Sequence, residues 1–153
     1  GRLTLRAARK QSKEVKADRQ LQLGDVLVNS TGAGTLGRVA QVRTSLPDCT
    51  VDTHVTIVRP DDPKSAAFLG VALLEQEPVL STMGVGSTNQ LELARADIAA
   101  ISLVIPPAQI RCVFHDLVWP LFMQVETLAK SNESLAEARD ALLPKVMFGE
   151  IAV

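Results

Sequence analysis

The chain is poor in cysteine, in long apolar runs and in net charge, and each shortage limits the class of protein. Its 153 residues include two cysteines, Cys49 and Cys112, whose separation fits neither a disulfide framework nor a structural zinc site. No apolar run has the length of a membrane span, and no signal peptide opens the chain. We therefore expect a soluble protein of the reducing cytoplasm. Because the chain begins at Gly1 rather than Met, we also expect a fragment or a trimmed chain.

The small net charge of −1 hides a strong asymmetry. Residues 1–19 hold seven basic and two acidic side chains, a net charge of +5, whereas the remainder carries −6. This pattern is typical of a localised basic surface that binds phosphate, although a solvated terminal segment has the same composition. With 46% hydrophobic and 22% charged residues, the chain suits one globular domain with a sizeable core and one appended element.

An α+β domain is predicted for residues 1–105, because short strand patterns are interspersed with helical ones. Alternation of apolar and polar residues indicates half-buried strands, and the spacing of Ala67, Val71 and Leu74 indicates a helix with one apolar stripe. The basic residues up to Gln20 fit either a helix or irregular structure. The predicted elements are strands over 26–28, 36–42 and 51–58, a helix over 65–76, an extended piece with a glycine loop within 79–90, one or two helical turns over 95–100, and a last strand over 101–105.

A different architecture, a long helix, is predicted over residues 106–153. The pattern is helical to about Leu143, with leucines every seven residues, a spacing typical of a helix that packs lengthwise against another helix. Pro120 is expected to kink this helix or to start a new one, and Asn132 near the seam to fix its register. The alternative is that the helix folds back and buries its leucines on its own domain. The row consists of Leu121, Leu128, Leu135 and Leu142, with Phe114 one step earlier.

The run Gly32-Ala33-Gly34-Thr35-Leu36-Gly37 comes close to two nucleotide-binding motifs without completing either. It satisfies G-x-G-x-x-G after a predicted strand, but a dinucleotide site then needs a helix, whereas the residues from Arg38 to Val42 alternate like a strand. It also lacks the lysine and the hydroxyl residue of a phosphate-binding loop, since Arg38 and Val39 stand in their places. A glycine loop between two strands is therefore predicted, and such a loop can approach a ligand closely.

No catalytic or metal-binding constellation is predicted. Asp61 and Asp62 are adjacent in a proline-bounded turn, whereas a metal-dependent nuclease brings its acids together from separate strands. His54 and His115 lack the spacing of a metal pair; we expect His54 to be exposed on a strand and His115 to be structural on a helix. The chain is therefore expected to contain no catalytic residue and to bind no metal or cofactor.

Three segments, taken in order, cover nearly the whole chain with one recognisable pattern. They are LGDVLV over 23–28 followed by Gly37-Arg38-Val39; GSTNQ over 86–90 followed by Leu91, Leu93, Ile98 and residues 101–107; and RDALLPKVMFGEI over 139–151. Together they resemble the start and the end of a recognition domain, and the end of the long helix, in the DNA-specificity subunits of type I restriction-modification systems. The chain departs from that family in having Ala108-Gln109 instead of Glu-Gln, Pro120 within the helix, and a single recognition unit.

The resemblance implies a globular recognition domain followed by a spacer helix that pairs with a second such helix as an antiparallel coiled coil. Two such units make a full subunit in the family, so we expect a fragment or a natural half-subunit. The complete enzyme adds modification subunits that methylate adenine with S-adenosylmethionine, and restriction subunits that cleave with ATP. The chain itself is predicted to be non-catalytic.

Two functions remain open from the sequence. The first is specific recognition of double-stranded DNA, with modification subunits, restriction subunits through them, and a second specificity half or a second copy of the chain as partners. The second is a coiled-coil assembly adaptor whose globular domain binds protein. The leucine row supports both functions, whereas the basic N-terminus and the polar loops favour the first.

The candidate site residues form three groups. Irregularly spaced cations suit contacts with the DNA backbone, whereas arginine and amide side chains in loops suit contacts with base edges. For residues 87–90, the alternative role is in loop shape or in contact with a modification subunit. We expect phosphate contacts from Arg6, Arg9, Lys10, Lys13, Lys16 and Arg19; base contacts from Arg38, Arg43, Ser87, Asn89 and Gln90; and helix pairing through Leu121, Leu128, Leu135 and Leu142.

Overall fold

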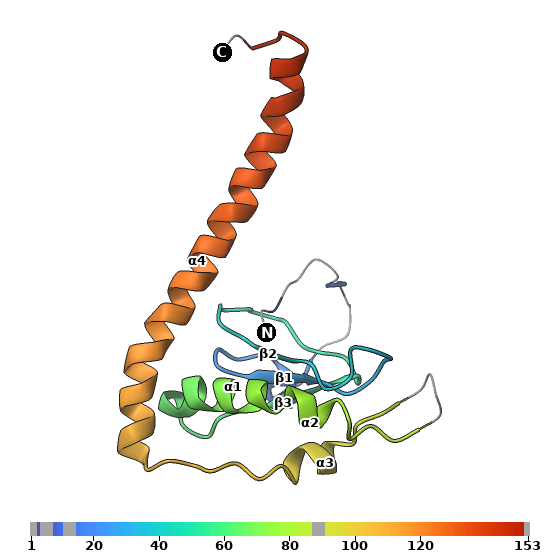
Figure 1. The fold of residues 1–153 in the computed structure, drawn as a ribbon, viewed down its shortest axis with the longest axis vertical. Helices are drawn as coiled ribbons and strands as arrows, with labels where there is room; N and C mark the ends of the chain where they lie inside the picture. The colour runs from blue at the N-terminus through green and yellow to red at the C-terminus, as the bar shows by residue number, and fades with distance from the viewer. Residues whose placement is uncertain (1–2, 4–7, 11–14, 87–90, 152–153) are drawn as a thin grey trace. The chain divides into compact units, whose positions relative to one another are not determined.

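The computed structural model describes residues 3, 8–10, 15–86 and 91–151. The chain divides into two compact units, Gly1–Trp119 and Pro120–Val153. An antiparallel sheet with short helices, followed by a long C-terminal helix, confirms the predicted α+β fold class. The elements in chain order are η1 (Ala17–Arg19), β1 (Val26–Asn29), β2 (Val39–Gln41), β3 (Val55–Val58), η2 (Pro63–Ser65), α1 (Ala66–Glu75), α2 (Glu77–Leu80), α3 (Arg95–Ala99) and α4 (Ala108–Met147) (Figure 1).

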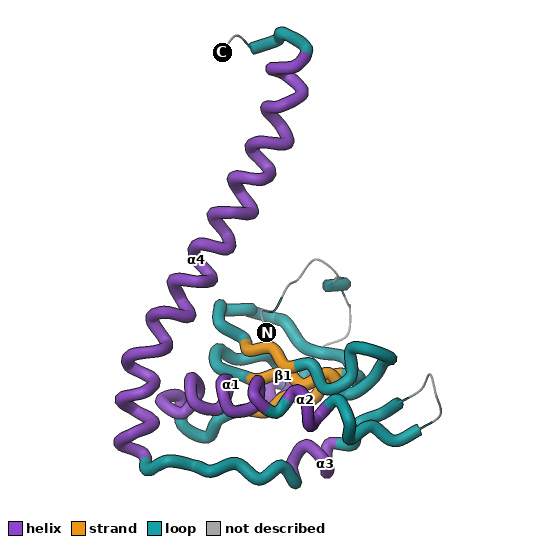
Figure 2. Tube along the Cα trace, in the orientation of Figure 1, coloured by secondary structure: helices purple, strands orange, loops and turns teal. Residues whose placement is uncertain are grey.

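The first unit is built around a three-stranded sheet in the order β2-β1-β3. Its strands are drawn in orange in Figure 2. Both neighbours run antiparallel to β1, with Leu27 opposite Ala40 in β2 and opposite Ile57 in β3. Because side chains alternate along a strand, Val26 and Val28 point to one face of the sheet and Leu27 points to the other. All three are buried, so β1 is covered on both faces.

The main core lies on the face of the sheet that we call the first face, where α1 packs. A buried amide joins the helix to the sheet there: the side chain of Gln41 donates to the carbonyl oxygens of Ala66 (2.7 Å) and Gly24 (3.3 Å). Gly70 of α1 leaves room for this amide, since a Cβ at that position would overlap the Gln41 side chain. The core cluster comprises Val26, Val28, Leu36, Val39, Leu73, Leu80, Leu93 and Ile98.

Predictions for the elements of the first unit were confirmed for β1, α1 and α3, and were wrong in extent elsewhere. The strand predicted over 51–58 begins only at Val55, because the Asp52 carboxylate accepts a hydrogen bond from the His54 N–H (2.9 Å) and closes a turn. The strand predicted over 36–42 is restricted to β2. The extended piece predicted from Val79 is instead the end of α2, which follows α1 directly and has proline in its first turn.

Residues 101–105, predicted as a last strand, form an extended segment outside the sheet. Ile101 and Leu103 pack against the core, whereas Val104 is 93% exposed. Two of the apolar side chains that suggested a strand therefore do belong to the core. Within the described part of the chain, however, no strand runs beside this segment to complete a ladder.

α4 confirms the long helix predicted after the double proline. The prediction that Pro120 starts a new helix is wrong, because α4 continues through both Pro120 and Pro144. An interior proline removes the hydrogen bond of its own nitrogen and crowds the carbonyl four residues earlier, but the flanking turns keep their hydrogen bonds. The part of α4 within the second unit, from Pro120 to Met147, is roughly 40 Å long at about 1.5 Å per residue. The predicted domain boundary between residues 105 and 106 stays a prediction.

Candidate nucleic-acid interface

The second face of the sheet is the one to which Asp25, Leu27 and Ala40 point. Asp25 precedes β1, and its carbonyl accepts a hydrogen bond of 2.8 Å from Val42 N, which extends the ladder between β1 and β2. Val26 lies opposite Val58 in the adjacent pair, so Asp25 lies opposite Arg59. Opposed residues of antiparallel strands share a face, and Arg59 therefore belongs to the second face.

Asp25 and Arg59 form a bidentate ion pair on this face. The Asp25 side chain is 0% exposed, and it accepts hydrogen bonds of 2.8 Å from both Nε and Nη2 of Arg59. The backbone N–H of Gln22 adds a third hydrogen bond of 2.8 Å to the carboxylate. The pKa of Arg59 is raised chiefly by its hydrogen bond to Asp25. A buried carboxylate is tolerated when donors satisfy it in this way.

The same guanidinium holds the segment that carries the N-terminal cations. Nη2 of Arg59 also donates to the carbonyl oxygen of Gln20 at 2.7 Å. The Thr50 hydroxyl, in the loop between β2 and β3, donates to the carbonyl oxygen of Arg19 at 2.7 Å. The N–H of Leu21 donates to a backbone carbonyl of that loop at 2.8 Å. Three hydrogen bonds, at the consecutive residues Arg19, Gln20 and Leu21, thus fix the end of the basic segment to the edge of the second face.

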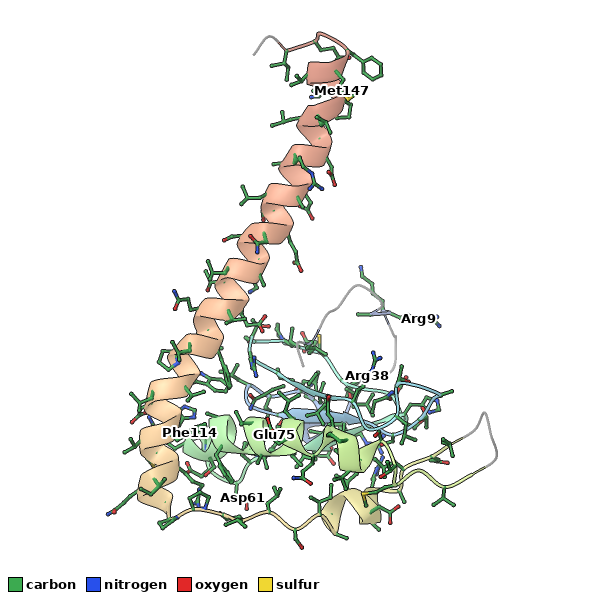
Figure 3. All side chains as sticks on the ribbon, in the orientation of Figure 1. Arg9, Arg38, Asp61, Glu75, Phe114 and Met147 are labelled. Atoms are coloured by element: carbon green, nitrogen blue, oxygen red, sulfur yellow. The ribbon has the colours of Figure 1, made fainter. Side chains whose placement is uncertain are left out.

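The predicted phosphate-contacting cations are exposed wherever they are described. Lys16 precedes η1 and Arg19 is its last residue, and the N–H of Arg19 donates to the carbonyl oxygen of Lys16 at 2.9 Å. In the view of Figure 3, Arg9 and Arg38 lie toward the upper side of the first unit and Asp61 toward the lower side. The exposed cations are Arg9, Lys10, Lys16 and Arg19, whereas Arg6 and Lys13 lie outside the described residues.

Arg38 reaches the second face through a β-bulge at Gly37. Gly37 N donates to the Asn29 carbonyl (2.8 Å) and Asn29 N donates to the Arg38 carbonyl (2.9 Å), so two residues oppose one residue of β1. Gly37 has a φ of 79°, the left-handed conformation of the first residue in this type of bulge. Beyond the bulge Arg38 alternates in phase with Ala40. The exposed Arg38 side chain therefore points to the second face.

The glycine loop before this bulge is held by its own hydrogen bonds. The Asn29 side chain donates to the carbonyl oxygens of Thr31 and Thr35, both at 2.9 Å. The loop leads into β2 rather than a helix, which confirms that the nucleotide-binding motif is incomplete. At Gly37 a Cβ would lie 2.5 Å from the backbone N of Ser81, so glycine permits the loop to pack against the end of α2.

Arg43, the other predicted base-contacting arginine, lies on the first face. It is in phase with Gln41, and its Nε makes a long hydrogen bond of 3.5 Å to the Gln41 Oε1. Arg38 and Arg43 therefore diverge across the sheet instead of converging on one ligand. The remaining predicted base contacts, Ser87, Asn89 and Gln90, lie outside the described residues.

Carboxylates line the helix side of the same loop. A shallow depression of about 420 Å³ is bordered by α1, α2 and the loop before β2, and its lining includes Glu75, Glu77 and Arg38. Glu77 accepts a hydrogen bond of 2.6 Å from Val39 N through its Oε1. These two acidic side chains disfavour a polyanion on this side of the unit.

The predicted histidines and acids form no catalytic group. His54 is exposed in the turn before β3 rather than on the strand, and Asp61 and Asp62 are exposed in a bend before η2. His115 lies on α4 as expected and stacks on Trp119, with ring centroids 5.1 Å apart; burial is the main cause that lowers its pKa. In the described part of the chain, no group of three or more His, Cys, Asp or Glu side chains is arranged to hold a metal.

The leucine row lies in the second unit and is exposed. Two helical turns span about seven residues, so the four leucines share one side of α4. Their exposed fractions are 58% for Leu121, 56% for Leu128, 68% for Leu135 and 51% for Leu142. Phe114, which the sequence suggested as an earlier member, is half-buried; the exposed apolar side chains of α4 in the first unit are Ile110, Val113 and Leu117.

Comparisons with known proteins identify two to which the chain is similar in sequence. No family model matches the chain. The chain is 30% identical over 119 residues to the type I restriction enzyme HindI specificity subunit of Haemophilus influenzae, a match over 76% of the chain and 25% of that protein. It is 45% identical over 80 residues to the type I restriction enzyme MjaIX specificity subunit of Methanocaldococcus jannaschii, over 52% of the chain and 18% of that protein.

The chain is homologous to type I restriction enzyme specificity subunits. The resemblance inferred from three short segments is thereby confirmed. The matched residues span a quarter or less of each of these two specificity subunits. In the part of this homologue that the structure describes, no helix combines the length and apolar character needed to cross a membrane.

Two residues of this specificity-subunit homologue were missed by sequence reasoning, Arg59 and Gln41. Each lies at a strand end or within a strand and makes its decisive contacts with residues far away in sequence. The alternation of side chains along a strand could have indicated from the sequence that Arg38 and Arg43 point to different faces. Arg38 and Arg43 are separated by an odd number of positions, and residues so separated on one strand point to opposite faces.

Proposed function

We propose that the chain is a DNA-recognition unit of a type I restriction-modification specificity subunit, either a fragment or a half-subunit. It contacts double-stranded DNA and directs methylation and cleavage that partner subunits perform, and it contributes no catalytic residue or cofactor. One observation carries the proposal: Arg38 and the anchored end of the basic segment belong to the second face of the sheet. The carboxylates Glu75 and Glu77 come from the helices that cover the other face, where Arg38 also borders their depression.

The cations of the second face suit two kinds of DNA contact. Lys16 and Arg19 are exposed on a segment that hydrogen bonds fix at its end, as contacts with phosphates in a defined register require. Arg38 stands at the end of a hydrogen-bonded loop, and an arginine can donate two hydrogen bonds to guanine in the major groove. Arg43 is less suited to base contact, since its guanidinium engages Gln41.

The test compares two double variants that remove the same charge. Lys16→Ala with Arg19→Ala removes two cations of the second face, and Lys64→Ala with Arg95→Ala removes two exposed cations elsewhere in the first unit. Fluorescence anisotropy measures binding to a random duplex and to a duplex enriched by selection, over a salt series. Loss of two phosphate contacts should lower the slope of log affinity against log salt by about 2 and weaken binding to both duplexes alike.

The control double variant should bind like the wild type. Equal losses in the two double variants would refute the assignment of the second face, as would a loss confined to the selected duplex. A wild type whose affinity for duplex DNA does not change with salt would refute the DNA-binding function itself. That last result would favour the alternative, a coiled-coil adaptor whose globular unit binds protein.

We also propose modification subunits, and restriction subunits through them, as cytoplasmic partners, and a second helix as the partner of α4. That helix comes from a second specificity half or from another copy of the chain. A soluble protein generally avoids leaving a continuous apolar row exposed, which supports pairing through the four leucines. Asn132, beside this row, is suited to fix the register of the pair.

A further inference from the structure

We infer that Arg59 is a positioning residue for DNA binding: it holds the basic segment in place so that Lys16 and Arg19 meet the phosphate backbone. The inference rests on the proposed function and extends it to a residue that need not contact DNA. Arg59 follows β3 and is separated by about forty positions from the segment that it holds, so the contact is made only in the folded sheet.

The geometry assigns two tasks to one guanidinium. Two of its donors, Nε and Nη2, bind the buried carboxylate of Asp25 at 2.8 Å. The other donors face the basic segment, where Nη2 also binds the Gln20 carbonyl at 2.7 Å and Nη1 approaches the Asp18 carbonyl at 3.5 Å. Because the guanidinium is planar and rigid, the position of the buried carboxylate fixes the position of the segment backbone.

Lysine cannot perform both tasks at once. An ammonium on a flexible stem can neutralise Asp25, but it lacks the planar fork that spans the carboxylate and the Gln20 carbonyl. Arg59→Lys therefore keeps the buried charge compensated while releasing the segment. The Thr50 hydroxyl, which donates to the Arg19 carbonyl at 2.7 Å, gives a second and milder way to loosen it.

Holding the segment matters because an unanchored chain must be ordered when it binds. Pre-organised contact groups avoid that entropic cost, and affinity rises accordingly. In the wild type the cations of η1 already occupy fixed positions beside the second face. In Arg59→Lys the same charges are present but ordered only on binding. The variant should then lose affinity although net charge is unchanged.

A double-mutant cycle on the full chain separates positioning from a general structural role. Arg59→Lys is measured alone and together with Lys16→Ala and Arg19→Ala, with a random duplex as the probe. We expect Arg59→Lys to weaken binding about tenfold in the wild-type background and less than about twofold in the background without the two cations. Equal fold losses in both backgrounds would overturn the inference.

Trypsin supplies a readout that needs no DNA. Cleavage after Arg19 should be at least several times faster in Arg59→Lys than in the wild type, while cleavage after Arg95 stays unchanged. Thr50→Val should change cleavage and affinity in the same directions by smaller factors, and it serves if Arg59→Lys does not fold. Unchanged cleavage after Arg19 in the folded variants would overturn the inference. Failure of the proposed function would appear in the wild type alone, as an affinity for duplex DNA that does not change with salt.

Discussion

Replacement of Gly37 by alanine should destabilise the first unit much more than the same replacement at Gly34. The two glycines have nearly equal φ values, 79° and 75°. They differ in surroundings: a Cβ at Gly37 would lie 2.5 Å from Ser81 N and 2.7 Å from the Leu80 carbonyl carbon, whereas nothing lies within 4 Å of a Cβ at Gly34. The pair therefore separates the cost of the backbone conformation from the cost of close packing.

The magnitudes follow from these distances. A left-handed backbone costs an alanine about 1–2 kcal/mol, and the stiffer unfolded chain returns about 0.4–1 kcal/mol of that cost. Gly34→Ala should thus lose between about 0 and 1.6 kcal/mol. At Gly37 the contacting atoms belong to the backbone, which cannot rotate away, so overpacking adds about 1–3 kcal/mol. The difference between the two variants should therefore be about 1–3 kcal/mol.

Urea unfolding followed by the fluorescence of Trp119, the one tryptophan, measures this difference in the first unit. Midpoints are compared at equal slopes, which checks that the extent of unfolding is unchanged. If the two variants unfold within about 0.5 kcal/mol of each other, packing of the bulge against α2 contributes nothing and the account of Gly37 is wrong.

Three further predictions concern other parts of the chain. Gln41→Leu should destabilise the first unit by about 1–3 kcal/mol in urea unfolding, because it removes the two hydrogen bonds that the buried amide donates to the Gly24 and Ala66 carbonyls; a loss below about 0.5 kcal/mol would contradict the role of the amide. Folding lowers the pKa of His115, so the unfolded state binds the proton first and stability is lost as the pH falls below about 6.5; His115→Gln should reduce that loss, and an unchanged pH profile would count against it. Leu128→Ala with Leu135→Ala should reduce self-association in sedimentation, whereas Lys130→Ala should not; a wild type that stays monomeric at high concentration would exclude self-pairing.

Local pattern was sufficient for most helices and for the central strand. β1 is a short apolar run, α1 has an apolar stripe, and leucines every seven residues mark α4. Each of these patterns can be recognised from residues that are close in sequence. The strand predicted over 101–105 failed for the opposite reason. The segment is apolar, as a buried strand is, but a strand also requires a neighbour, and pairing is decided by distant parts of the chain.

The candidate site was predictable in its charges and not in its geometry. The excess of cations before residue 20 pointed to a phosphate-binding segment from composition alone. The residue that fixes this segment, Arg59, could not be identified without the register that sets it opposite Asp25. Likewise the bulge at Gly37, which aims Arg38, depends on two backbone hydrogen bonds across strands.

The connection between β2 and β3 has a consequence for how such a protein changes over generations. All of residues 43–54 are described, and none of their side chains is buried. Substitutions in this loop therefore leave the packing of the core untouched, and longer versions cost little additional closure entropy. The Cys49–Thr50 attachment to the basic segment and the hydrogen bond from Ser30 N to the His54 carbonyl constrain it. A lineage can thus alter the tip of this loop, and whatever it touches, while inheriting the same sheet.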